Sequence, residues 1–273
     1  MREQTITGGD GIKLHVMEGG NPDGRPLLFI HGWSQCRLAW LNQFNSDLAE
    51  DFRLVAMDIR GHGLSEKPHD AYGDSKLWAD DVHAVITELG LDRPIVSGWS
   101  YGGMIICDYL RVHGEAILGG VQFVSAISRL GTDAAFAVIG EEFVTNAVAS
   151  FSTDAEECIR AIEAYMAQVT YGDLPPDAWY FILGYNAIVP PHVRQALFSR
   201  NIENDDLLPT IGLPMLITHG DRDEVVLPAA AEQHAAMIPH AIHSVYENVG
   251  HAPFAEAAER FNRELREFAS AAA

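Results

Sequence analysis

Short apolar runs alternate with segments of helical periodicity along most of the chain. The apolar runs lie at residues 27–30, 52–57, 94–97, 119–124 and 214–218. Continuous rather than alternating apolarity is typical of strands that are buried on both faces, as in a parallel sheet. Between the runs, apolar residues recur with helical spacing at residues 38–48, 76–89, 101–113, 229–238 and 255–268. This order predicts an α/β protein with a mostly parallel central sheet flanked by helices.

Both ends of the chain add strands to this pattern. Two alternating segments, residues 4–7 and 12–18, flank the glycine-rich turn at residues 8–11, which predicts an antiparallel hairpin. A further short strand is predicted at residues 244–246, before the last helix.

The alternation stops between residues 128 and 208, where no strand-like run occurs. This segment has helical periodicity at residues 136–151, 155–169, 179–185 and 191–202, and it is rich in aromatic residues. We therefore expect a helical cap, residues 128–208, inserted before the penultimate strand. Residues 1–127 and 209–273 would form the core.

Composition and charge narrow the possible partners. The 273 residues are 48% hydrophobic and 21% charged, as in an ordinary globular protein. The net charge of −20 argues against nucleic acid or an anionic membrane as a partner, because both are bound through lysine and arginine. No apolar stretch reaches the roughly 20 residues of a membrane span, and none follows Met1 as a signal peptide would. We expect a cytoplasmic protein whose three cysteines, Cys36, Cys107 and Cys158, are free thiols.

The strongest chemical signal is Gly-Trp-Ser-Tyr-Gly-Gly at residues 98–103. It follows a predicted buried strand and opens a predicted helix. A serine on such a sharp turn has a strained backbone, so the residues two before and two after it must lack bulk, as Gly98 and Gly102 do. The pattern predicts that Ser100 is a nucleophile. The backbone N–H of the next residue, Tyr101, would then point at a developing oxyanion.

A serine hydroxyl is a weak nucleophile, so it needs a base and a group that orients the base. Among twelve histidines, His251 lies in a glycine-flanked loop after the last predicted strand, where α/β sheets place their chemistry. The loop after the preceding strand carries three carboxylates, Asp221, Asp223 and Glu224, as candidates for the orienting acid.

Four motifs in this order resemble the α/β-hydrolase superfamily, in its branch of small serine esterases and cofactor-free haloperoxidase-like perhydrolases and lactonases. They are His-Gly-Trp at residues 31–33, the turn at residues 58–65, the serine motif at residues 98–103, and the segments around Gly220 and His251. The resemblance implies that the acid is Asp223, three residues after Gly220, with Asp221 as the alternative. It also implies that the backbone N–H of Trp33 is the second oxyanion-hole donor, beside that of Tyr101.

Other polar motifs have structural interpretations. We expect His31 to be a structural hydrogen-bonding residue, and residues 58–65 to form a strand-end turn whose polar side chains satisfy buried backbone groups. No cysteine and histidine spacing is typical of zinc, and no glycine motif is typical of a nucleotide site. We predict no metal and no cofactor.

The resulting hypothesis is a serine hydrolase that cleaves small, mainly neutral carboxylic esters or lactones through an acyl-serine. Residues 128–177 of the predicted cap include nine acidic residues and only two arginines, Arg129 and Arg160, and this negative charge favours neutral substrates. A few of its aromatic residues should line the pocket over Ser100, beside Trp33 and Tyr101. Three alternatives stay open: a small-molecule receptor with slow turnover, a carbon–carbon bond hydrolase, and a perhydrolase.

Overall fold

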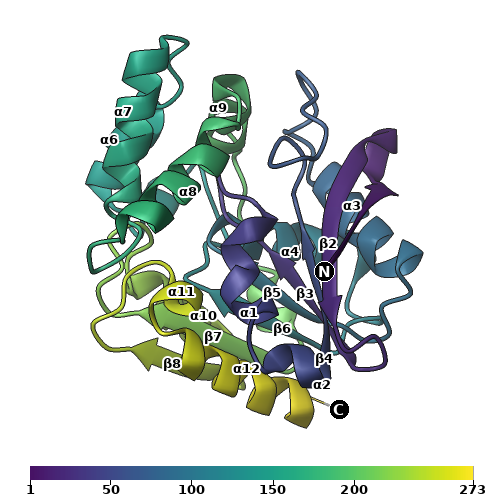
Figure 1. Cartoon of the computed structure of the whole chain (residues 1–273). Coiled ribbons are helices and arrows are strands. Elements are labelled where there is room, and N and C mark those ends of the chain that lie inside the picture. Colours follow the sequence, from purple (N-terminus) through teal and green to yellow (C-terminus); the bar gives the residue numbers. More distant parts are fainter. Residues whose placement is uncertain (273) are drawn as a thin grey trace.

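A single eight-stranded sheet organises the molecule (Figure 1). The computed structural model describes residues 1–272. The strands are β1 (Arg2–Thr7), β2 (Lys13–Gly20), β3 (Arg25–Ile30), β4 (Phe52–Met57), β5 (Ile95–Trp99), β6 (Gly120–Val124), β7 (Met215–Gly220) and β8 (Ile242–Tyr246). Their order across the sheet is β1-β2-β4-β3-β5-β6-β7-β8. The β1–β2 hairpin is antiparallel and joins β4 antiparallel, whereas all pairs from β4 to β8 are parallel.

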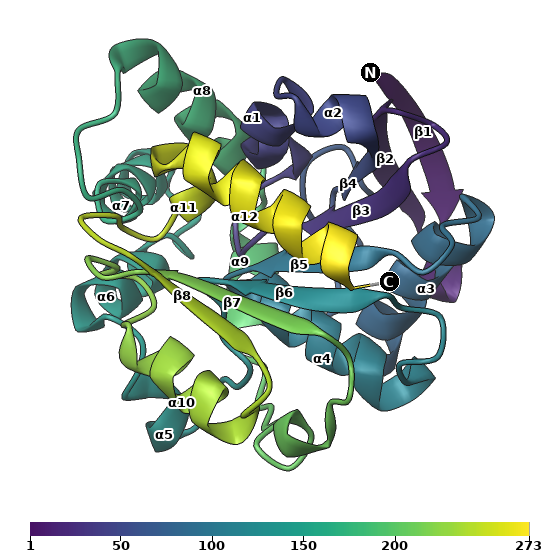
Figure 2. The same ribbon diagram turned by 90° about the horizontal axis from the view of Figure 1, so that it is seen from below.

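Helices cover both faces of this sheet. One face carries α3 (Ser75–Glu88), α4 (Tyr101–His113) and α10 (Ala229–Met237). The opposite face carries α1 (Leu41–Phe44), α2 (Leu48–Asp51), α11 (Pro253–Glu256) and α12 (Ala258–Ala271), and Figure 2 shows α12 across the sheet from α4 and α10.

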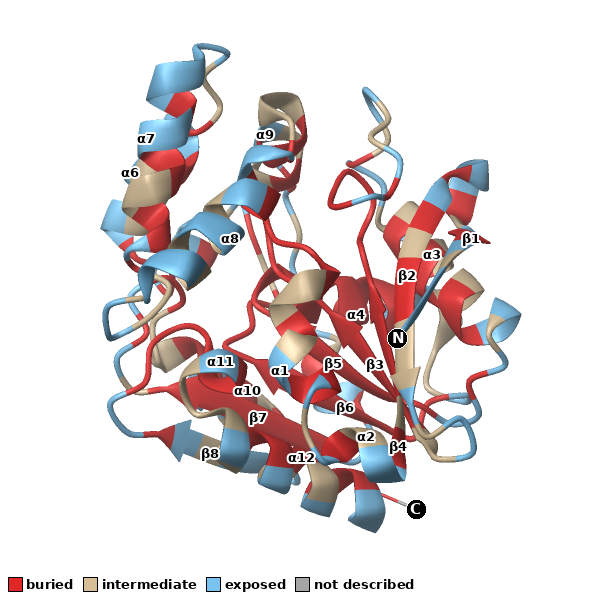
Figure 3. Cartoon of the chain, viewed as in Figure 1, coloured by how far each residue is buried: buried red, intermediate tan, exposed pale blue. Residues whose placement is uncertain are grey.

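The two faces explain the unbroken apolar runs. Along β3, Leu28 and Ile30 pack into the core under α3 and α4, while Leu27 and Phe29 pack into the core under α12. Successive side chains of a strand point to opposite faces, so a strand buried on both faces needs an apolar residue at every position. The strands are buried along the centre of the sheet in Figure 3. The predicted fold class is confirmed.

The segment between β6 and β7 is helical, as predicted, and contributes no strand to the sheet. Its helices are α5 (Asp133–Phe136), α6 (Glu141–Ala149), α7 (Ala155–Met166), α8 (Pro176–Ala187) and α9 (Pro191–Phe198). We call residues 128–208 the helical insert. Helices α6 to α9 lie beyond the edge of the sheet where the parallel strands end (Figure 1). The division into a core and a separate cap domain stays an interpretation.

Several predicted helices are shorter or broken. The segment 38–48, predicted as one helix, forms a 3₁₀ turn (Arg37–Trp40) followed by α1, and α2 begins only at Leu48. Ser46 causes the break, because its hydroxyl donates to the Gln43 carbonyl and accepts from the Leu48 amide, in competition with the helical pattern. The segment 255–268 is likewise divided between α11 and α12. No helix in the described part of the chain is both long and apolar enough to cross a bilayer.

Candidate active site

Ser100 occupies the turn between β5 and α4. Its φ of 55° and ψ of −116° lie outside the ordinary regions for a residue with a side chain. The turn is tight enough that a Cβ on Gly98 would come within 2.6 Å of the Gly102 backbone. A Cβ on Gly102 would lie 2.6 Å from the Ile30 carbonyl oxygen. A side chain at either position would collide with the backbone, as predicted. The strained turn places Ser100 at the N-terminus of α4.

The loops after β7 and β8 bring Asp223 and His251 together. His251 Nδ1 lies 2.8 Å from Asp223 Oδ2, and both side chains are buried. The other carboxylate oxygen, Oδ1, accepts hydrogen bonds from the Val225 and Val226 amides, each at 2.9 Å. These two amides fix the carboxylate plane, so the imidazole is fixed with it.

The ionisation state of Asp223 determines which ring nitrogen of His251 carries the proton. Burial alone would raise the pKa of Asp223, but the neighbouring His251 and His219 imidazoles hold this pKa well below its usual range. His219 Nε2 lies 3.2 Å from Oδ2 and 2.8 Å from the Val226 carbonyl oxygen, so it is a donor. An ionised carboxylate only accepts, so neutral His251 carries its proton on Nδ1 and leaves Nε2 as a base.

The alternative acids lie in different surroundings. Asp221 Oδ1 accepts from the Asn248 amide at 2.6 Å and therefore closes the turn between the two loops. Glu224 is exposed. Among the three carboxylates of this loop, only Asp223 is hydrogen-bonded to His251.

Two backbone amides near Ser100 have no acceptor within the described protein. Gly32 packs against it so closely that an added Cβ would lie 3.0 Å from Ser100 Cβ, and the next residue is Trp33. Tyr101 is the first residue of α4. Within residues 1–272, neither the Trp33 nor the Tyr101 amide donates to a protein acceptor. Both are thus free to bind an oxyanion, and their role as the oxyanion hole stays a prediction.

The space beside Ser100 is small and aromatic. One cavity of about 20 Å³ is lined by Ser100, His251 and Trp33, and a second of about 30 Å³ by Ser100, Tyr101 and Trp33. The Trp33 ring lies 5.8 Å from that of Phe143, 5.4 Å from Tyr165 and 6.2 Å from Phe198, measured between ring centroids. These three aromatic residues of the insert close the space over Ser100, and Trp33 and Tyr101 are walls of it, as expected.

Ser100 Oγ and His251 Nε2 are both unengaged. Both residues line the same cavity, and among the described residues the side chain of His251 is hydrogen-bonded through Nδ1 alone, to Asp223. The geometry brings together the five residues predicted from the sequence: Ser100, Asp223, His251, Trp33 and Tyr101. Their roles in catalysis stay a prediction.

The motif at residues 58–65 is structural. Asp58 accepts from the Arg37 and Leu64 amides at 2.7 and 2.8 Å, and from the Arg37 guanidinium at 2.9 Å. His31 Nδ1 donates to the Gly32 carbonyl at 2.8 Å, and its Nε2 accepts from the Ile59 amide at 3.1 Å. This agrees with the predicted strand-end turn and the predicted structural role of His31.

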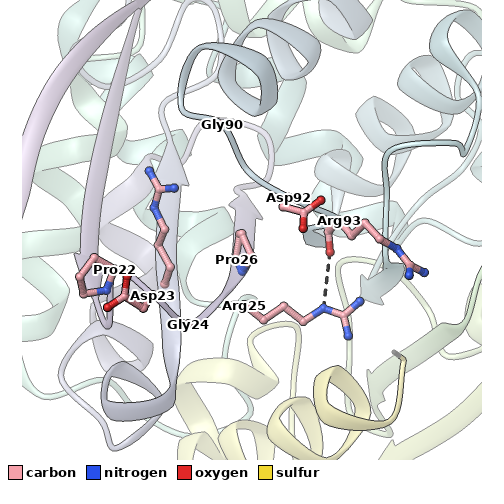
Figure 4. A pocket seen from close by; sticks show the side chains of 9 residues that line it. Pro22, Asp23, Gly24, Arg25, Pro26, Gly90, Asp92 and Arg93 are labelled. Atoms are coloured by element: carbon pink, nitrogen blue, oxygen red, sulfur yellow. Dashed lines mark hydrogen bonds between the residues drawn. The ribbon is translucent and has the colours of Figure 1, made fainter.

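A separate hollow of about 420 Å³, shown in Figure 4, lies near the start of β3. None of its lining residues lines a cavity beside Ser100. Two of its three arginines are engaged. Arg25 donates to the Arg93, Ala269 and Ala272 carbonyls, and Arg53 pairs with Glu18. It contains no nucleophile or base of the kind found at Ser100. Within the described chain, no cluster of three or more His, Cys, Asp or Glu side chains is arranged to hold a metal ion.

Glu256 is a site residue that sequence reasoning missed. Its carboxylate accepts from the amides on either side of His251, Gly250 at 3.1 Å and Ala252 at 3.2 Å, and from the Tyr171 amide of the insert at 2.8 Å. The His251 amide itself donates to the Val169 carbonyl at 2.9 Å. A proline followed by a glutamate in a first helical turn is a recognisable helix start, but its reach around His251 depends on the fold.

Comparisons with known proteins show which family the chain belongs to. A model of the alpha/beta hydrolase family matches residues 27–264. The crystal structure of the esterase RhEst1 from Rhodococcus sp. ECU1013 is 37% identical, covers 100% of both chains and superposes with a TM-score of 0.93. The non-heme chloroperoxidase CPO-A1 of Kitasatospora aureofaciens is 30% identical over 95% of this chain and 96% of its own. The structure of Est816, described as an N-acyl homoserine lactone degrading enzyme, is 27% identical, with a TM-score of 0.77 over 96% of this chain and 99% of its own.

The fold and the strand-to-helix turn at Ser100 are those of an α/β hydrolase. The chain belongs to the α/β-hydrolase family. Its homologues include esterases and non-heme haloperoxidases, so the resemblance inferred from the motifs is confirmed.

Proposed function

We propose that the protein hydrolyses small, mainly neutral carboxylic esters or lactones through a covalent acyl-serine on Ser100. The observation that carries the proposal is the hydrogen bond between Asp223 and His251, in a cavity that Ser100 shares. This bond leaves Nε2 of His251 free as the base beside a serine at a strained turn. The esterase relative, and the lactone-degrading activity given for Est816, support the ester and lactone substrates.

The reaction has two halves. His251 Nε2 takes the Ser100 proton as Oγ bonds to the substrate carbonyl carbon, and the oxyanion that forms is held by the Trp33 and Tyr101 amides. The carbon–oxygen bond to the alcohol then breaks, and His251 returns its proton to the leaving alcohol. Water, deprotonated by His251, attacks the acyl-serine, releases the carboxylic acid and restores Ser100. Asp223 stays ionised and stabilises the imidazolium in both halves.

The lining of the site favours neutral substrates. Neither cavity beside Ser100 is lined by a lysine or arginine of the described chain, and most of the lining is aromatic or aliphatic. An anionic substrate would lose hydration there without gaining a counter-charge.

Perhydrolysis is a second candidate, favoured by the non-heme chloroperoxidase relative. In that reaction hydrogen peroxide replaces water as the nucleophile that attacks the acyl-serine, and the product is a peracid. An assay with acetate and hydrogen peroxide measures it directly.

Covalent labelling tests the proposal. A phosphonylating reagent should add one label per chain, on Ser100, and abolish hydrolysis of p-nitrophenyl acetate in proportion to labelling. Ser100→Ala should fold normally and lose nearly all turnover. An active Ser100→Ala variant, or a label on another residue, would refute the mechanism. A folded protein that turns over none of a panel of aryl esters and lactones would favour a binding protein instead.

A further inference from the structure

A large apolar groove adjoins the small catalytic cavity. The groove has a volume of about 500 Å³ and lies between α1, α8 and α11. It shares three lining residues, Gln35, Trp99 and Val169, with the cavity that contains Ser100 and His251. The two spaces are therefore neighbours, separated by these side chains. Since the cavities beside Ser100 measure only about 20 and 30 Å³, most of a larger substrate has to lie elsewhere.

The position of His251 indicates which part of an ester the groove receives. The leaving alcohol takes its proton from His251, so the alcohol oxygen must lie on the His251 side of Ser100. His251 lines the cavity that adjoins the groove, whereas the other cavity is lined by Tyr101 and lacks His251. The acyl group therefore belongs beside Tyr101, and the alcohol part extends toward the groove.

Gln35 stands at the junction with an unused acceptor. It is only 4% exposed, and its Oε1 is buried without a hydrogen-bond partner among the described residues. A buried acceptor without a partner is destabilising and uncommon. Its position between the groove and the catalytic cavity offers a reason: a bound substrate can supply the missing donor.

The neighbours of Gln35 fix its orientation. Asn186 Nδ2 donates to the Ile182 carbonyl at 2.9 Å, so Asn186 Oδ1 is left to accept. That oxygen accepts from the Tyr165 hydroxyl and from Gln35 Nε2, the latter at 3.4 Å. Because the amide nitrogen of Gln35 is directed to Asn186, the carbonyl oxygen is the end that remains free.

We infer that the preferred substrates are esters of short acids whose alcohol part carries an N–H or O–H donor followed by an apolar group. The donor hydrogen-bonds to Gln35 Oε1, and the apolar group occupies the groove. This inference rests on the proposed ester hydrolysis at Ser100, and it assigns to Gln35 a substrate-binding role.

A matched pair of esters tests the hydrogen bond. N-(2-acetoxyethyl)benzamide has an amide N–H and a phenyl group, and its N-methyl analogue lacks only the donor. We expect the wild-type enzyme to favour the N–H ester about tenfold in kcat/KM, because the methylated ester leaves Gln35 Oε1 unpaired. Gln35→Met should reduce this ratio to about one. Asn45→Met, which changes an exposed amide at the groove, is the matched control and should keep the ratio.

Two further measurements separate this inference from the proposed function. Binding of the same two compounds to Ser100→Ala, measured by calorimetry, requires no turnover and should show the same preference. Ala178→Phe, which narrows the groove, should lower the kcat/KM of the benzamide ester relative to ethyl acetate about tenfold. Efficient hydrolysis of both esters with a ratio near one in the wild-type enzyme overturns the inference and leaves the proposed function standing. Failure of the phosphonylating reagent to label Ser100 overturns the proposed function instead.

Discussion

Two buried clusters of histidine and aspartate lie at the same edge of the sheet, and they differ in one respect. In the first, Asp58 accepts from two amides and a guanidinium, and His31 uses both ring nitrogens. His62 likewise accepts from the Ser34 amide on Nε2 and donates to the Arg60 carbonyl from Nδ1. Every ring nitrogen of these two histidines is engaged, so this cluster holds loops together.

In the second cluster, both carboxylate oxygens of Asp223 accept hydrogen bonds, but His251 forms a hydrogen bond through Nδ1 only. Burial does not distinguish the clusters, since His31 is 0% exposed and His251 is 3% exposed. What differs is a ring nitrogen left free at a cavity that also contains a serine. A histidine with both nitrogens engaged supports the fold, whereas one with a free nitrogen can transfer a proton.

Replacing His251 and His31 by alanine, one at a time, should give the largest difference in activity between the two clusters. His251→Ala should lower kcat on p-nitrophenyl acetate by about 10⁴-fold or more, because Ser100 loses its base. The matched His31→Ala should lower kcat far less but reduce the free energy of unfolding by about 2 kcal/mol, since two buried backbone groups lose their partner. Steady-state kinetics and urea unfolding of both variants check this. Comparable losses of kcat would remove the distinction between the clusters.

The two aspartates of the loop after β7 form a second contrast. Asp223→Asn should reduce kcat by about 10⁴-fold, because an asparagine can offer its amide N–H to Nδ1 and so favour the wrong tautomer. Asp221→Asn should reduce kcat less than tenfold, since Asp221 accepts from the Asn248 amide and lies 3.8 Å from the Arg222 guanidinium but is not bonded to His251. Kinetics on the two isosteric variants decide the assignment. The opposite ranking would transfer the orienting role to Asp221.

The residues of the candidate site could be named from the sequence because their constraints are local. Glycines at positions 98 and 102 follow from the steric limits of one turn. The loops at the ends of consecutive parallel strands offered His251 and three carboxylates, and the family resemblance selected Asp223 among them; the catalytic roles stay predictions. The broken helix around Ser46 was missed because a side-chain hydrogen bond there overrides the apolar periodicity.

The roles of Gln35 and Glu256 could not be predicted in the same way. The free acceptor of Gln35 results from Asn186 and Tyr165, about 150 and 130 residues away in the chain, and no spacing rule connects them. The donors to Glu256 likewise depend on where the insert meets the loop of His251. Which aromatic residues of the insert reach Ser100 was equally a matter of packing between distant helices.

Two buried histidines outside the candidate site also predict how the free energy of unfolding depends on pH. Burial lowers the pKa of His31 to about 4 and, together with nearby cationic groups, that of His234 to about 3, from an ordinary value of 6.5. The unfolded chain therefore binds protons below pH 6.5 that the folded protein does not. The free energy of unfolding is therefore highest above pH 6.5 and falls as the pH is lowered. The expected decrease between pH 8 and pH 5 is about 2 kcal/mol per histidine.

Urea unfolding at pH 8 and pH 5 measures this loss. His234→Leu removes one of the buried imidazoles, so its free energy of unfolding should fall less between the two values than that of the wild type. His69→Leu, at an exposed position, should leave the difference unchanged. An equal loss in wild type and His234→Leu would show that His234 does not contribute to the pH dependence.

The smallest expected effect concerns how the loop of His251 is held. Glu256 accepts from the Gly250, Ala252 and Tyr171 amides with two carboxylate oxygens, whereas a glutamine has one oxygen and an NH₂ group that would face a donor. Glu256→Gln should therefore lower kcat about tenfold and change KM less than twofold, because the imidazole shifts while the substrate cavity keeps its walls. The matched control is Glu259→Gln, an exposed glutamate three residues further on, which should match the wild type. If Glu256→Gln raised KM and left kcat intact, the carboxylate would shape the cavity through the insert rather than position His251.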